Sequence, residues 1–166
     1  MPVVALIAML GVTATDLSDC EGFSGTYREV GVVEQASGAL PEGGNVLLSL
    51  AVSRQAMPGL ERPESVILSA SPDDGVLRVT LVGTQRFEMT FPVTCAQGAY
   101  RIERLDRNAP AGEGVDLVRY TETILLRPDA SGLDVRVMSE GRYRTWPFFH
   151  RTEKHDDRYR FTRESP

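Results

Sequence analysis

The chain has 166 residues, of which 42% are hydrophobic and 25% are charged, and its formal net charge at pH 7 is −5. This length suffices for one domain with a substantial core, and the composition is that of a globular rather than a disordered protein. The negative charge excludes bulk attraction to nucleic acid, so no nucleic-acid partner is expected. The charge is uneven, however, because residues 141–166 carry seven basic and four acidic side chains.

The chain begins with an apolar run over residues 2–11. This run is too short to span a bilayer, which needs about 20 residues, but it fits the apolar core of a secretory signal. Small residues at 12–14 then suit a signal peptidase, whereas the missing basic segment leaves a buried first strand as the alternative. The polar segment 15–21 breaks the run abruptly and favours the signal. We therefore predict a signal-like segment and polar spacer over 1–19, a single β domain over 20–166, and secretion across the inner membrane to the periplasm or cell envelope.

The first part of the β domain contains a strand, a loop and one ambiguous segment. We predict a strand over 24–33 and, where Gly and Pro are frequent, a loop over 36–45. The segment 45–57 fits a short helix with Asn45 as N-cap and Pro58 as terminator. It fits a strand equally well through the alternation of Val46, Leu48, Leu50 and Val52. A helix is favoured because this segment is long for a strand.

The stretch 64–104 organises the rest of the chain. It predicts four strands joined by tight turns, at 65–70, 76–82, 85–93 and 99–104. In the third of them the apolar residues share one face, and they are Phe87, Met89, Phe91 and Val93. A period of two is typical of a half-buried antiparallel strand. The connections are so short that consecutive strands must run in opposite directions.

The remainder of the chain predicts three or four further strands. In order, we expect a loop over 108–114, a strand over 116–127, a turn over 128–132 and a strand over 133–138. Gly141 is expected to break that run, and a strand over 142–151 follows, in which Pro147 indicates a bulge or an edge. A polar turn over 153–156 then leads to a last strand over 157–163, with Tyr159 and Phe161 facing inward.

These elements predict a mostly β protein with about eight or nine strands and at most one short helix. The strands are expected to form an antiparallel up-and-down meander. A long meander must protect its two edges, and a strongly twisted sheet of this size tends to curl. We therefore predict that the sheet closes into a lipocalin-like barrel.

Cys20 and Cys95 are the two cysteines of the chain. In an oxidising compartment a disulfide between them is expected, and closing a loop of about 75 residues stabilises the fold by roughly 4 kcal/mol. Lipidation is the alternative, because Cys20 lies where the acylated cysteine of a bacterial lipoprotein would lie. Asp19 departs from that pattern, which requires a small uncharged residue before the cysteine. Two buried free thiols are the third alternative.

Three short motifs carry a resemblance. They are Cys20 with Phe23-Ser24-Gly25-Thr26-Tyr27-Arg28, then Val93-Thr94-Cys95, and finally Asp157-Arg158-Tyr159-Arg160-Phe161. Together they resemble small, uncharacterised bacterial envelope proteins, many of them lipoproteins, which implies an envelope location and no particular activity. Gly25-Thr26-Tyr27 is also similar to the glycine-x-tryptophan motif of the first lipocalin strand, with Tyr27 in place of the tryptophan.

A candidate ligand-binding face lies on the strand over 116–127. Tyr120 and Glu122 share this face with two aliphatic residues, Ile124 and Leu126. If the face lines the interior, Glu122 needs a partner there and could orient a ligand, whereas Arg119 lies on the other face and cannot pair with it. The alternative, in which Glu122 is solvated, is favoured because alternation in this strand is poor.

Two aromatic residues, Tyr143 and Trp146, complete the candidate ligand-binding set with Glu122 and Tyr120. Large aromatic side chains of this kind also fill barrels simply as core or rim residues. The sequence therefore favours core or rim positions for Tyr143 and Trp146 over a binding role.

His150 and His155 flank three carboxylates, Glu153, Asp156 and Asp157. Imidazoles and carboxylates could bind zinc or copper, but a solvated hairpin turn needs the same polar residues. We favour the turn and predict no metal and no cofactor. The sequence has no Gly-x-Ser-x-Gly motif, and none of its serines is singled out by its neighbours, so an enzyme is not expected.

Taken together, these observations predict a non-enzymatic β-barrel domain that binds a small apolar or amphipathic ligand. The alternative is a surface-acting envelope interaction protein or inhibitor with a filled core and an envelope protein as partner. Contact with a membrane is expected only if Cys20 is acylated.

Overall fold

The computed structural model describes residues 20–37, 41–53, 63–112, 114–145 and 149–164, and within them the chain forms eleven strands and one short helix. The strands are β1 (Phe23–Arg28), β2 (Val30–Gln35), β3 (Asn45–Leu47), β4 (Ser65–Ser71), β5 (Val76–Val82), β6 (Arg86–Pro92), β7 (Thr94–Ala96), β8 (Ala99–Gly112), β9 (Val115–Pro128), β10 (Gly132–Thr145) and β11 (Phe149–Thr162), and the helix is α1 (Leu48–Ser53). Neighbouring strands pair antiparallel. The predicted mostly β, antiparallel class with one short helix is confirmed.

The strands form two sheets rather than a single meander. The smaller sheet has the order β1-β4-β5-β6, and the larger one has the order β3-β2-β11-β10-β9-β8-β7. Consecutive strands pair from β4 to β6 and from β7 to β11, so the meander prediction holds for these two runs. Among the described residues the two end strands of the larger sheet, β3 and β7, do not pair with each other. A lipocalin-like barrel is therefore not confirmed.

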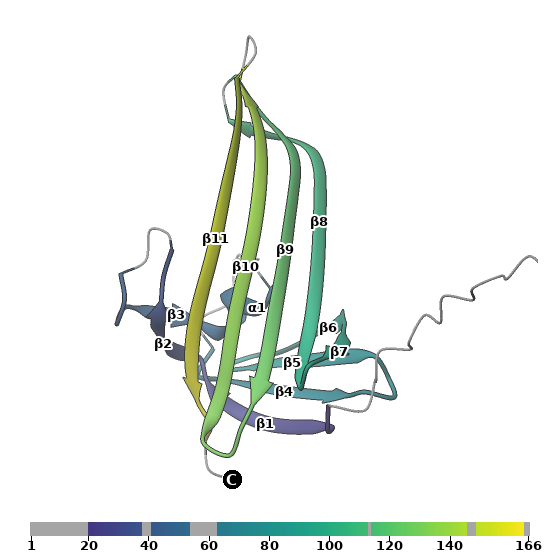
Figure 1. Cartoon of the computed structure of the whole chain (residues 1–166). Coiled ribbons are helices and arrows are strands. Elements are labelled where there is room, and N and C mark those ends of the chain that lie inside the picture. The colour runs from purple at the N-terminus through teal and green to yellow at the C-terminus, as the bar shows by residue number, and fades with distance from the viewer. Residues whose placement is uncertain (1–19, 38–40, 54–62, 113, 146–148, 165–166) are drawn as a thin grey trace, which may run out of the picture.

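Four strands of 14 residues each, β8 to β11, form a long twisted blade (Figure 1). The smaller sheet crosses one end of this blade, near the turn between β9 and β10, and α1 lies beside it. We call the end of the blade that the smaller sheet crosses the core end, and we call the opposite end the far end. In β10, each residue from Leu133 to Thr145 pairs with both β11 and β9.

Two chain breaks that the sequence predicts in the blade are wrong, because β10 passes through Gly141 and β11 passes through residues 153–156. The loop predicted over 108–114 exists but is shorter, since β8 continues to Gly112 and β9 begins at Val115. The expected strand over 142–151 is instead the end of β10 and the start of β11, separated by residues outside the described ranges. Polar and glycine residues are tolerated in these strands because cross-strand pairing satisfies the backbone even where no core covers it.

Gly141 has a packing role rather than a turn role. A Cβ atom at this position would lie 2.7 Å from the ring of Tyr143, which is too close for any real contact. The glycine therefore gives the Tyr143 ring room to lie against the strand.

The predicted first strand over 24–33 is two strands that meet at Glu29. β1 belongs to the smaller sheet and β2 to the larger one, so the chain passes between the sheets at this residue. The buried Glu29 also starts α1, because its backbone oxygen accepts the Leu48 N–H at 2.8 Å and its carboxylate accepts the Ser49 N–H at 3.0 Å. The helix prediction for 45–57 is thus right for Leu48–Ser53 only; Asn45 begins β3, and residues 54–57 lie outside the described ranges.

One hydrophobic core joins the two sheets. The strands predicted at 65–70, 76–82 and 157–163 place alternate apolar residues in this core, as expected. Its largest fully buried apolar side chains are Tyr27, Tyr100, Phe161, Leu48, Leu68, Leu77, Ile102, Ile124, Leu126 and Leu133. β6 is an edge strand, so its predicted apolar face is only partly buried and Phe87 is 41% exposed.

A disulfide joins Cys20 to Cys95, with the two Cα atoms 5.9 Å apart. It ties the segment before β1 to β7, and so connects the start of the smaller sheet to the edge of the larger one. In this state the Cys20 sulfur is not available for an acyl chain. Within the described ranges, no helix is long and apolar enough to cross a membrane.

Candidate functional site

The inner face of the blade is the face whose side chains enter the core. On β9 it carries Tyr120, Glu122, Ile124 and Leu126, and the last two are completely buried. Glu122 lies on the same face and is also buried. The favoured expectation that Glu122 is solvated is therefore wrong, because the two aliphatic residues at the core end decide which face turns inward.

Glu122 is held by two side chains. Nη1 of Arg104 lies 3.0 Å from its Oε1 atom, and the Tyr120 hydroxyl donates to its Oε2 atom at 3.1 Å. Arg104 stands directly opposite Glu122 in the register of β8 and β9, where opposite charges stabilise a strand pair. The result is a buried polar cluster, Arg104–Glu122–Tyr120, at the boundary between the core end and the far end.

Arg104 also contacts two other parts of the fold. Its Nη2 atom donates to the backbone oxygen of Val52 in α1, and its guanidinium lies 5.5 Å from the centre of the Phe91 ring in β6. A cation over an aromatic ring gains electrostatic energy in addition to the ion pair. One arginine therefore ties the blade, the helix and the edge of the smaller sheet together.

Sequence reasoning missed Arg104, although a signal for it exists. Arg104 shares its strand face with Tyr100 and Ile102, which both enter the core. The sequence prediction ended this strand at residue 104 and did not pair it with the next strand, so it tested only Arg119 as a partner of Glu122. Arg119 does lie on the opposite face, as predicted, because it alternates with Tyr120 and stands opposite Arg107 and Arg142.

Tyr143 lies on the inner face next to this cluster. Its ring covers Gly141, and Gly141 is the residue opposite Tyr120 on the neighbouring strand. Tyr120 and Tyr143 are both partly exposed, whereas Glu122 below them is buried. Three of the four predicted site residues thus lie together on the inner face, with Tyr120 and Tyr143 partly exposed and Glu122 buried. The fourth, Trp146, lies outside the described ranges.

The two histidines do not lie at a hairpin tip, so that prediction is wrong. Both belong to β11, where His155 stands opposite Ser139 on the inner face and His150 stands opposite Arg144. Residues five apart in a strand point to opposite faces, so these imidazoles cannot converge on one ion. Within the described part of the chain, no group of three His, Cys, Asp or Glu residues is placed to hold a metal.

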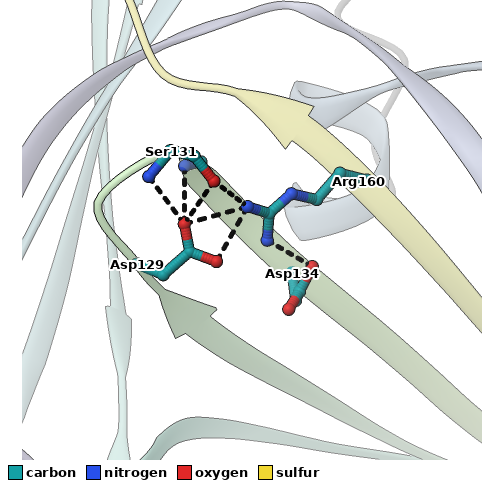
Figure 2. Close-up of polar contacts among 5 residues, drawn as sticks. Asp129, Ser131, Asp134 and Arg160 are labelled. Carbon is teal, nitrogen blue, oxygen red and sulfur yellow. Dashed lines mark hydrogen bonds and ion pairs between the residues drawn. The ribbon is translucent and has the colours of Figure 1, made fainter.

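A second polar network closes the β9–β10 turn at the core end (Figure 2). The Asp129 carboxylate accepts the backbone N–H groups of Ser131 and Gly132 at 2.7 and 2.9 Å, as the predicted turn over 128–132 requires. Arg160 of β11 donates to Asp129 at 2.9 Å and to Asp134 at 2.5 Å. The Arg160 guanidinium, followed by the Ser131 N–H, holds the pKa of Asp129 well below its usual range. This network is structural, since it fixes the hairpin that starts β10.

Among the described residues, two cavities are lined mostly by residues of the outer face of the blade. One, of about 190 Å³, is lined by residues that include Glu34, Arg136 and Arg158, and the other, of about 390 Å³, includes Ser37 and Lys154. Neither is lined by Glu122, Tyr120 or Tyr143. These three predicted site residues are therefore separate from both cavities.

Comparisons of the chain with protein-family models, with curated proteins and with solved structures give no match. Function is therefore inferred from the chemistry of the chain itself.

Proposed function

We propose that this protein is a non-enzymatic, secreted or envelope-associated domain that binds a small amphipathic ligand on the inner face of the blade. The observation that carries the proposal is the placement of Tyr120 and Tyr143, partly exposed, beside the buried Arg104–Glu122 pair. Aromatic rings next to a few convergent polar groups are typical of small-molecule sites.

The cluster offers distinct contacts to the two parts of an amphipathic molecule. The apolar part would lie against the rings of Tyr143 and Tyr120. The guanidinium of Arg104 has five N–H donors, and its bonds to Glu122 and Val52 use two of them. Since the Arg104 side chain is 22% exposed, its remaining N–H groups can donate hydrogen bonds to a polar or anionic group of the ligand.

A lipocalin-like enclosure of the ligand is part of the same proposal. The two sheets already share one core at the core end, and the larger sheet is long and twisted. A ligand on the inner face would extend this packed region toward the far end, as a ligand in the mouth of a barrel does.

Secretion to the periplasm or cell envelope is supported by the Cys20–Cys95 disulfide, because such bonds persist in oxidising compartments. The mass of the unfolded, unreduced protein tests this directly. A mass lacking two hydrogens agrees with the disulfide, whereas an added acyl chain or an intact pair of thiols contradicts it.

The test of ligand binding is native mass spectrometry on protein purified gently from its own envelope. We expect a mass that is lost on unfolding, and we expect Tyr143→Ala to retain it at least tenfold less well. Thr123→Ala is the matched control, since Thr123 lies on the outer face of β9 and should retain the ligand as wild type does. Absence of a lost mass, or equal retention by both variants, would contradict the proposal.

A surface-acting envelope protein is the second candidate. It is favoured by large apolar side chains that remain exposed on the blade, Leu105 at 49% and Phe149 at 72%. Exposed apolar residues of this kind are common at protein interaction sites when they gather in patches. Recovery of a defined envelope protein by crosslinking at Phe149, together with no bound small molecule, would support this candidate over the first.

A further inference from the structure

The edge of β8 is open along most of its length. β7 pairs only with Ala99 to Arg101, and among the described residues no strand covers the same edge from Ile102 to Gly112. Figure 1 shows this edge facing away from the other elements of the molecule. An open edge of this length is a template for pairing with another strand.

The hairpin between β7 and β8 determines which backbone groups face the open edge. Its two turn residues, Gln97 and Gly98, both have positive φ, as in a type I′ turn, so Ala99 is hydrogen-bonded to β7. Hydrogen bonding then alternates along β8 without a register shift in this part of the strand. The N–H and C=O groups at positions 103, 105 and 107 consequently point away from β9.

We propose that a second copy of this chain pairs with β8 through the same edge, antiparallel and centred on Leu105. The segment Glu103-Arg104-Leu105-Asp106-Arg107 has alternating charges that are complementary to themselves in this arrangement. Residue 103 of one copy meets residue 107 of the other, residue 104 meets residue 106, and Leu105 meets its own equivalent. A twofold axis through the Leu105 pair generates the whole interface, as isologous dimers require.

The side chains of this segment are suited to such a partner. Leu105 is 49% exposed, and Asp106 and Arg107 have no ion pair or hydrogen bond among the described residues. Arg107 moreover stands opposite Arg119 on β9, which is an unfavourable pairing of like charges. Glu103 of a second copy, which pairs with Arg101 at 2.5 Å within its own chain, would offset this repulsion through its second carboxylate oxygen. The Arg104–Asp106 contact should add less, because Arg104 already pairs with Glu122.

The geometry also limits the length of the interface. In this register the paired segment covers residues 102–108 of each copy, and beyond it the second copy would meet β7. β8 curves toward the other blade strands at its far end, which carries its last residues away from that position (Figure 1). A contact of this size is small, so we expect a dimer with a dissociation constant on the order of 10 µM.

Crosslinking by cysteine tests the register. With Cys20 and Cys95 joined, Leu105→Cys adds a single free thiol, and paired Cα atoms about 5.5 Å apart permit a disulfide between copies. We expect nearly complete covalent dimer in Leu105→Cys on mild oxidation. Thr152→Cys, near the start of β11 on the other side of the blade, should stay mostly monomeric. Equal crosslinking of the two variants would overturn the proposal.

Charge reversal tests the partner independently of crosslinking. Glu103→Arg and Arg107→Glu each place like charges opposite one another twice in the dimer, so each variant alone should dimerise about tenfold more weakly than wild type. A mixture of the two variants restores complementary pairs at every position and should recover the wild-type affinity. The measurement is sedimentation from about 5 to about 500 µM. A wild-type protein that is monomeric throughout, or a mixture no tighter than the single variants, would refute pairing with a second copy and leave the edge to a different protein.

Discussion

The two ends of the blade consist of the same four strands, yet their side chains follow different rules. At the core end the inner face of β10 carries Leu133, Val135 and Val137, which are buried against the smaller sheet. At the far end the corresponding positions carry Gly141, Tyr143 and Thr145. The backbone pairing is equally regular at both ends. Hydrophobic alternation in this protein therefore indicates where a strand packs against the core. It does not indicate whether the chain forms a strand.

The largest effect should come from the Arg104–Glu122 pair, which separates the two ends. We expect Arg104→Met to lower the free energy of unfolding by about 3–5 kcal/mol, because it breaks the ion pair that Arg104 forms with the buried Glu122 carboxylate. Urea denaturation measures this loss. The double variant Arg104→Met/Glu122→Leu removes both charges and should regain most of the stability. If the double variant is as unstable as the single one, loss of the cation beside the buried carboxylate is not the cause.

A matched pair of valines compares the two ends directly. Val135→Ala at the core end should lower the free energy of unfolding by about 2–3 kcal/mol, because the side chain is almost fully buried and its removal leaves a cavity. Val115→Ala at the far end makes the same chemical change at a partly exposed site and should cost less than about 1 kcal/mol. Thermal or urea unfolding of both variants gives the difference. Equal losses would mean that the far end is packed as tightly as the core end.

The same contrast explains what the sequence could predict. The strands at 65–70, 76–82 and 157–163 pack on the core, and their alternation located them correctly. Pairing alone holds the far end, and its polar residues and glycines resemble turns when they are read along one strand. For this reason the breaks at Gly141 and 153–156 were wrong and the loop predicted over 108–114 was too long.

The candidate site could be predicted in part. Glu122 and Tyr120 were found because they share a face with aliphatic residues, and Tyr143 because it is a large aromatic residue near them. Arg104 could not be found without the β8–β9 register, since it is 18 residues away in sequence and meets Glu122 only across the strand pair. Contacts of this kind depend on the pairing register of the two strands, which a loop predicted only as 108–114 does not define.

A smaller effect is expected at the β9–β10 turn. The pKa of Asp129 is lowered in the folded protein, so its ionised form stabilises the fold above the unfolded pKa of about 4. This contribution is lost as the pH falls below that value toward the folded pKa. Because the Asp129 side chain is 45% exposed and screened by solvent, we expect Asp129→Asn to cost below about 1 kcal/mol at pH 7.

Urea unfolding of wild type and Asp129→Asn from pH 7 to pH 2 measures this linkage. The stability difference between the two proteins should be constant near neutral pH and shrink below about pH 4. Other ion-paired carboxylates, such as Asp156 with Arg136, lower the stability of both proteins alike in acid and cancel in the difference. A difference that grows on acidification would show that the Asp129 carboxylate does not stabilise the turn.

The smallest change in stability, and the most local one, should follow from Gly141→Ala at the far end. The added Cβ would lie 2.7 Å from the Tyr143 ring, which must move away. Because this ring is partly exposed and not locked in the core, its displacement should cost less than about 1 kcal/mol. The same displacement moves Tyr143 from its position beside Tyr120, so ligand retention should fall while the fold persists. Native mass spectrometry and urea unfolding of one preparation separate the two effects. A large loss of stability would instead place Tyr143 in the core, and an unchanged ligand mass would remove it from the binding surface.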